Sequence, residues 1–173
     1  MQSQLTSTTA PSGDDPSSVF RVSGLRCVVL SCFDHDSTFL ASMLGQAGIR
    51  VHRACTVERA DFLLIATQAT VLVLDTTFLD GSWVEALAMT AHVHPLVAPL
   101  ICADRIDREF VANARERGAF DILWRPIELE RLRSSIWTAH EVTLERRLWL
   151  AERELHRKVN LCPDAALHLA TVR

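Results

Sequence analysis

Asp75 is the residue of this chain that is best placed to do chemistry. It ends the aliphatic run Val-Leu-Val-Leu at positions 71–74. Such a run is typical of a strand that is buried on both faces of a parallel sheet. In open α/β sheets, ligands collect at the carboxyl ends of the strands. Asp75 is therefore either a functional group or a cap for the loop that follows it.

Other reactive side chains form no recognisable catalytic pattern. His92 and His94 could bind zinc as a pair, but the alternative is a polar cap at a helix end. Five cysteines without regular spacing indicate a reducing compartment and no disulfide framework. The sequence has no glycine-rich phosphate loop, no Ser-His-Asp order and no paired-carboxylate motif. We therefore expect a protein that is not an enzyme.

The elements that must position Asp75 alternate regularly along the chain. Apolar runs near residues 27–30, 49–52, 69–74, 99–102 and 119–123 predict five strands, and a helical pattern follows each of them. Thr56 is a suitable cap for one of these helices, and Asp104 and Asp107 suit the first turn of another. The pattern predicts an α/β fold of the flavodoxin-like (βα)5 class, a doubly wound parallel sheet in the order 2-1-3-4-5.

Composition indicates where the domain begins and ends, and net charge indicates which class of partner it favours. The first 24 residues are rich in Ser, Thr, Pro, Gly and Asp, so we expect a disordered leader, then a domain at 25–140 and a helical extension with a tail at 141–173. A net charge of −3 favours protein partners over nucleic acid or anionic membrane. Neither a secretory signal nor a membrane span is evident, and we expect a cytoplasmic protein.

From about residue 26 to residue 140 the chain resembles the receiver domain of bacterial two-component response regulators. In that family a strand ends in a phosphoacceptor Asp, a Gly follows within a few residues, a Gly-Ala strand ends in Tyr-Leu, and a Lys-Pro pair precedes the last helix. The residues that carry the resemblance are Val71 to Asp75, Asp80-Gly81, Arg117 to Leu123, Arg125-Pro126 and Leu129. The resemblance makes Asp75 the phosphoacceptor candidate.

The chain departs from the family where two acidic residues should bind Mg²⁺. Ser31 and Cys32 stand at those positions, and neither is a hard anionic ligand. Asp34 and Asp36 lie two and four residues later, where they serve as helix caps or as a displaced metal site with Asp75. We expect no cofactor, with Mg²⁺ as the alternative.

The remaining pocket positions depart as well. In the family, the hydroxyl of a Ser or Thr at the end of the fourth strand reads out phosphorylation. Ala103 stands at that position, or Cys102 if the alignment is shifted by one residue. Arg125 replaces the lysine and should reach the same crevice as Asp75, where the two can form a structural ion pair. If Cys32 and Cys102 also reach this pocket, redox sensing is an alternative to buried structural thiols.

The last helix should continue far beyond the domain, to about residue 158. A heptad seam repeats along it at steps of four, three and four residues, formed by Leu144, Leu148, Ala151 and Leu155. Because these side chains would otherwise stay in water, we expect a homodimer through this seam. We expect no DNA-binding helix-turn-helix after it.

These features predict a degenerate, pseudo-receiver-like signalling module. It would act in a phosphorelay or as a phosphorylation-independent interaction domain, with a histidine kinase or another signalling protein as its partner. One alternative is a conventional receiver that is phosphorylated on Asp75. A second alternative is a flavodoxin-like flavin binder or enzyme, for which residues 31–34 make a poor phosphate loop.

Overall fold

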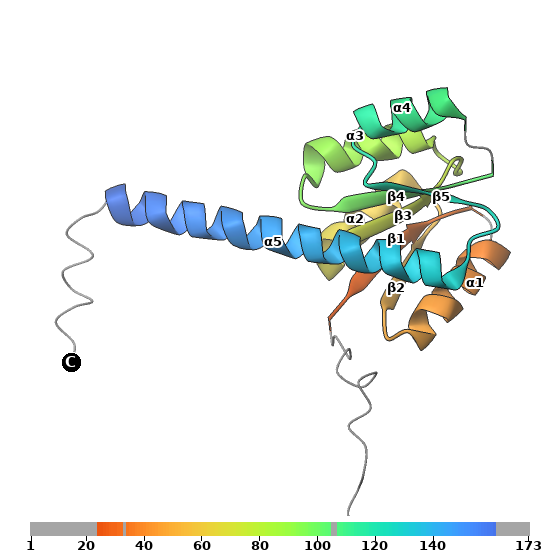
Figure 1. Cartoon of the computed structure of the whole chain (residues 1–173), viewed down its shortest axis with the longest axis horizontal. Coiled ribbons are helices and arrows are strands. Elements are labelled where there is room, and N and C mark those ends of the chain that lie inside the picture. Colours follow the sequence, from red (N-terminus) through yellow and green to blue (C-terminus); the bar gives the residue numbers. More distant parts are fainter. Residues whose placement is uncertain (1–23, 33, 105–106, 162–173) are drawn as a thin grey trace, which may run out of the picture.

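The computed structural model describes residues 24–32, 34–104 and 107–161, without the side chains of 34–37 and 159–161. Five strands alternate with five helices in this part of the chain (Figure 1). The strands are β1 (Arg26–Leu30), β2 (Arg50–Ala54), β3 (Val71–Asp75), β4 (Ala98–Ala103) and β5 (Asp121–Trp124). The helices are α1 (Asp34–Gln46), α2 (Val57–Thr67), α3 (Trp83–Val93), α4 (Arg108–Glu116) and α5 (Leu129–Leu161).

All strands are parallel, and the sheet has the order β2-β1-β3-β4-β5. This confirms the predicted flavodoxin-like (βα)5 architecture. The central strand β3 is buried along its whole length, as its uninterrupted aliphatic run predicted. Asp75 therefore lies at the carboxyl end of a fully buried strand.

Helices cover both faces of the sheet, and each face has its own apolar core (Figure 1). On one face Leu44 of α1 and Ile136 of α5 pack against Val29 and Val73. On the other face α2, α3 and α4 cover the alternate side chains of the same strands. This division follows from the period of two in the strands, which directs neighbouring side chains to opposite faces.

Local capping explains where several helices begin. The Thr56 hydroxyl accepts a hydrogen bond from the Arg59 amide, which confirms the predicted cap. Asp107, expected in the first turn of its helix, is instead the N-cap of α4 and accepts a hydrogen bond from the Phe110 amide. The predicted strand at 119–123 instead begins at Asp121, because the Ala119 amide donates to the last turn of α4 at Ala114. The second strand is Arg50–Ala54 rather than 49–52, since the Ile49 amide closes the end of α1.

α5 is far longer than the sheet it covers. Its 33 residues correspond to about 50 Å of helix, and its second half projects beyond the sheet (Figure 1). Contact with the domain continues past residue 140, because the Thr143 hydroxyl lies 3.5 Å from the Thr70 carbonyl. Among the described helices, none combines the length and the apolar character that crossing a bilayer requires.

Candidate functional site

Strand register brings the predicted pocket residues to one edge of the sheet. Asp75 pairs with Cys102 across β3 and β4, and Ala103 pairs with Trp124 across β4 and β5. Arg125 follows Trp124 directly, and its amide donates to the Ala103 carbonyl at 3.0 Å. Ser31 comes one residue after Leu30, which pairs with Leu74. The strand ends thus converge as the sequence predicted.

An ion pair between Asp75 and Arg125 dominates this edge. Arg125 Nη2 donates to Asp75 Oδ1, and the two side chains are 20% and 7% exposed. Arg125 Nε also lies 3.9 Å from the exposed Asp104 carboxylate. A guanidinium is planar and keeps its charge at any accessible pH. It therefore neutralises Asp75 continuously, and the burial of the Asp75 side chain limits the screening of the pair by water.

The positions where the family would hold a metal carry no carboxylate. Ser31 is buried, and its amide donates to the Ala54 carbonyl at 3.0 Å. Cys32 is half-buried, with Sγ 3.7 Å from the Thr77 carbonyl. Asp34 and Asp36 lie in the first turn of α1, and their side chains are outside the described part of the structure.

The donors that the structure describes at this edge do not fit Mg²⁺, which requires about six oxygen ligands in near-octahedral geometry. Within the described residues, no three His, Cys, Asp or Glu side chains are grouped closely enough to bind a metal ion. Among the described residues, this edge offers the carboxylate of Asp75, one of whose oxygens Arg125 already binds, and the exposed carboxylate of Asp104. A hydroxyl and a thiol beside it are poor replacements for two carboxylates.

The end of β4 lacks the hydroxyl that reads out phosphorylation in the family. The two candidate positions, Ala103 and Cys102, carry no alcohol group. Both residues are buried, at 1% and 2% exposed. Cys102 belongs to the apolar core under α1 and α5, while Cys32 lies beside the Thr77 carbonyl. Burial raises the pKa of a third thiol, Cys27, to about 12, as expected for a structural cysteine.

The loop after Asp75 contains an acidic residue whose role the sequence did not reveal. Both carboxylate oxygens of Asp80 accept from the Val57 amide, at 2.8 and 2.9 Å, so Asp80 caps α2 rather than its own loop. Phe78 from the same loop is buried against the second core. The contact spans 23 residues, and no local pattern signals it.

The two histidines near the end of α3 do not converge. His94 Nε2 lies 2.6 Å from Asp61 Oδ1 of α2, and His92 Nδ1 lies 2.7 Å from the Ala88 carbonyl of its own helix. Each ring therefore has a separate protein partner. The cap interpretation describes them better than a zinc pair.

No protein-family model matches the sequence, and no curated protein matches it. Solved receiver domains are nevertheless similar in structure. A response regulator receiver domain protein from Clostridium thermocellum is 18% identical, with a TM-score of 0.64 over 72% of this chain and 98% of that chain. The signal receiver domain of a putative LuxO repressor protein from Vibrio parahaemolyticus is 16% identical, with a TM-score of 0.66 over 72% and 95%.

The fold is that of a response-regulator receiver domain. The beryllofluoride-activated receiver domain dimer of NtrC4 is a further similar structure, 22% identical, with a TM-score of 0.63 over 68% of this chain and 98% of that chain. The carboxyl edge that holds Asp75 thus lies in a receiver fold, although its side chains differ from the family pattern.

Proposed function

We propose that this chain is a receiver-like signalling module that acts through protein contacts and does not depend on phosphorylation of Asp75. The observation that carries the proposal is the ion pair between Asp75 and Arg125 in a crevice without the acidic pair at Ser31 and Cys32. Phosphoryl transfer depends on positive charge that neutralises the phosphoryl oxygens, and a metal ion normally supplies it. Here a fixed guanidinium binds the acceptor carboxylate itself.

The long half of α5 supports the protein-contact part of the proposal. Leu148 and Leu155 of the seam are 65% and 62% exposed, and Trp149 beside them is 54% exposed. Exposed apolar side chains that gather on one helix mark an interaction surface. The charges that flank the seam have both signs, which permits a second copy to pair with it. The proposed partner of this surface is therefore the same helix of another copy.

The association state tests this function if it is measured with and without a phosphodonor. Light scattering of the full chain should give the same molar mass before and after acetyl phosphate and Mg²⁺ are added. Asp75→Asn should behave identically. A molar mass that changes with the phosphodonor in the wild type but not in Asp75→Asn would show that phosphorylation controls assembly, and the proposal would be wrong.

A further inference from the structure

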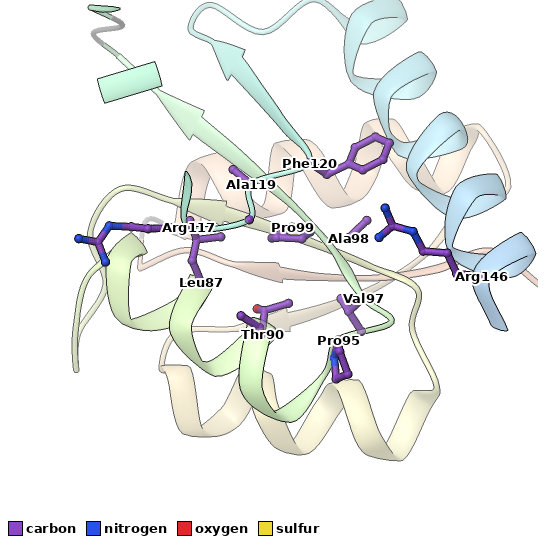
Figure 2. Close-up of a pocket in the computed structure, with 12 residues that line it drawn as sticks. Leu87, Thr90, Pro95, Val97, Ala98, Pro99, Arg117, Ala119, Phe120 and Arg146 are labelled. Atoms are coloured by element: carbon purple, nitrogen blue, oxygen red, sulfur yellow. The ribbon is translucent and has the colours of Figure 1, made fainter. Parts of the chain in front are cut away.

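A pocket of about 420 Å³ opens at the edge of the sheet where β4 and β5 begin. Because Asp75 ends its strand and all strands are parallel, this edge is opposite to the one that holds the ion pair. Apolar groups from three parts of the chain line the pocket, among them Leu87 of α3, Val97 and Pro99 at the start of β4, and Phe120 before β5 (Figure 2). Polar groups contribute as much of the exposed lining, so such a surface suits an occupant that has both an apolar side chain and a polar group.

Two arginines line the pocket, and Arg146 directs its positive charge toward it. Arg146 extends from α5 toward Val97 and Ala98, whereas Arg117 lies on the other side with its guanidinium directed outward (Figure 2). Arg117 Nε donates to Asn113 Oδ1 at 2.5 Å. Among the ion pairs of the described residues, none involves Arg146. An occupant that combines an apolar group with a carboxylate would match this combination.

Residues 1–23 of the same chain carry that combination. The acidic pair Asp14-Asp15 precedes Val19-Phe20 by a few residues. This segment joins β1 at the edge of the sheet where the strands begin, as the pocket does. Only β3 separates β1 from β4, which corresponds to about 10 Å. The nine Cα–Cα steps from Asp15 to Gly24 can span up to about 30 Å, so reach is not limiting.

We propose that the segment 14–20 binds this pocket in its own chain, with Phe20 against the apolar wall and Asp14 or Asp15 on Arg146. Covalent attachment keeps the segment at a local concentration on the order of millimolar, so a weak contact is sufficient. The neighbour of Arg146 is Arg147, whose guanidinium donates to the carbonyls of Gln68 and Ala69 at 3.4 and 3.3 Å. The bound segment therefore covers the place where α5 leaves the domain.

Carbodiimide coupling in the full-length chain tests the proposal, because it joins a carboxylate to an adjacent primary amine. Lys158 is the only lysine in the sequence, so Arg146→Lys adds one new amine while keeping the positive charge. We expect mass spectrometry to find an amide bond between residue 146 and Asp14 or Asp15 within one chain. The matched control is Arg133→Lys, which alters an exposed arginine near the start of α5 and should give no link to this acidic pair.

Substitutions in the segment complete the test. In the Arg146→Lys background, Asp14→Asn with Asp15→Asn should abolish the link, and Phe20→Ser should reduce its yield several-fold while Leu5→Ser leaves it unchanged. Coupling of residue 146 only to carboxylates outside residues 1–23 would overturn the proposal. A link to Asp14 or Asp15 that appears only in covalent dimers would overturn it too, because a second copy or another acidic peptide would then be the occupant.

Discussion

At the scale of single residues, the ion pair between Asp75 and Arg125 is the feature on which the account depends. The two side chains project from the ends of β3 and β5 and meet in a crevice that leaves Asp75 7% exposed. Removing one partner of such a pair leaves the other charge buried without compensation, which costs far more than the net contribution of the intact pair. The pair should therefore be visible in stability as well as in chemistry.

Arg125→Met should lower the free energy of unfolding by about 2–4 kcal/mol, because it removes the guanidinium that neutralises the buried Asp75 carboxylate. Arg125→Lys keeps the charge but loses the planar fork, and we expect a loss of about 1 kcal/mol. The double variant Asp75→Asn with Arg125→Met should recover most of the loss. Urea unfolding of these variants forms a double-mutant cycle. Additive losses would contradict a direct interaction.

His140 provides a second residue-scale prediction. It is 5% exposed and shares a 2.7 Å hydrogen bond with the Thr70 hydroxyl, and burial, followed by the Arg147 guanidinium, lowers its pKa. The unfolded chain then binds more protons than the folded one as the pH falls below about 6.5. The free energy of unfolding should therefore decrease from pH 7.5 toward pH 5 and level off below the folded pKa.

The measurement is urea unfolding of the wild type, His140→Gln and His156→Gln across that pH range. His140→Gln should show a flatter pH dependence than the wild type. His156→Gln, which alters an exposed histidine of the same helix, should follow the wild type. Equal slopes for the wild type and His140→Gln would refute the assignment.

At the scale of elements, α5 is both a part of the domain and a projection from it. Leu132, Ile136 and Ala139 pack in the first core. Further along the helix, His140 and Thr143 contact Thr70, and Arg147 donates to the Ala69 carbonyl just after α2. Truncation after Ala139 removes all of these polar contacts. We expect it to lower the free energy of unfolding by about 2–4 kcal/mol, at roughly 1 kcal/mol for each hydrogen bond.

Truncation after Leu150 is the matched control, since it keeps Arg147 within the helix and removes only the projecting part. At a protein concentration low enough to keep the full chain monomeric, its urea midpoint should stay close to that of the full chain. If both truncations unfold at the same midpoint, the contacts of His140, Thr143 and Arg147 contribute nothing measurable, and the domain ends earlier than the structure indicates.

The sequence predicted the elements well because their signals are local. The aliphatic run before Asp75 and the caps at Thr56 and Asp107 each depend on a few neighbouring residues. Strand ends also follow from topology, which is why Asp75 and Arg125 could be placed together. The contacts of Asp80 with α2 and of His94 with Asp61 connect distant segments. Such pairings depend on the packed structure, and sequence patterns do not encode them.

At the scale of the whole molecule, the projecting half of α5 should assemble two copies. Burying a leucine contributes roughly 1.5–3 kcal/mol, so several seam residues can offset the entropy of association. Leu148→Glu with Leu155→Glu should give monomers in light scattering with a folded domain. Leu150→Glu changes an exposed leucine outside the seam and should leave the dimer intact. A wild-type chain that is monomeric at high concentration would exclude this assembly.

The measurement that tests the central claim most directly is the intact mass of the full chain after incubation with acetyl phosphate and Mg²⁺. A receiver fold whose Asp75 is held by Arg125, without the acidic pair at Ser31 and Cys32, should keep the mass of the untreated protein. Asp75→Asn should give the same result. A stoichiometric gain of one phosphoryl group that disappears in Asp75→Asn would contradict the account, because it would show that Asp75 accepts phosphate in spite of its ion pair.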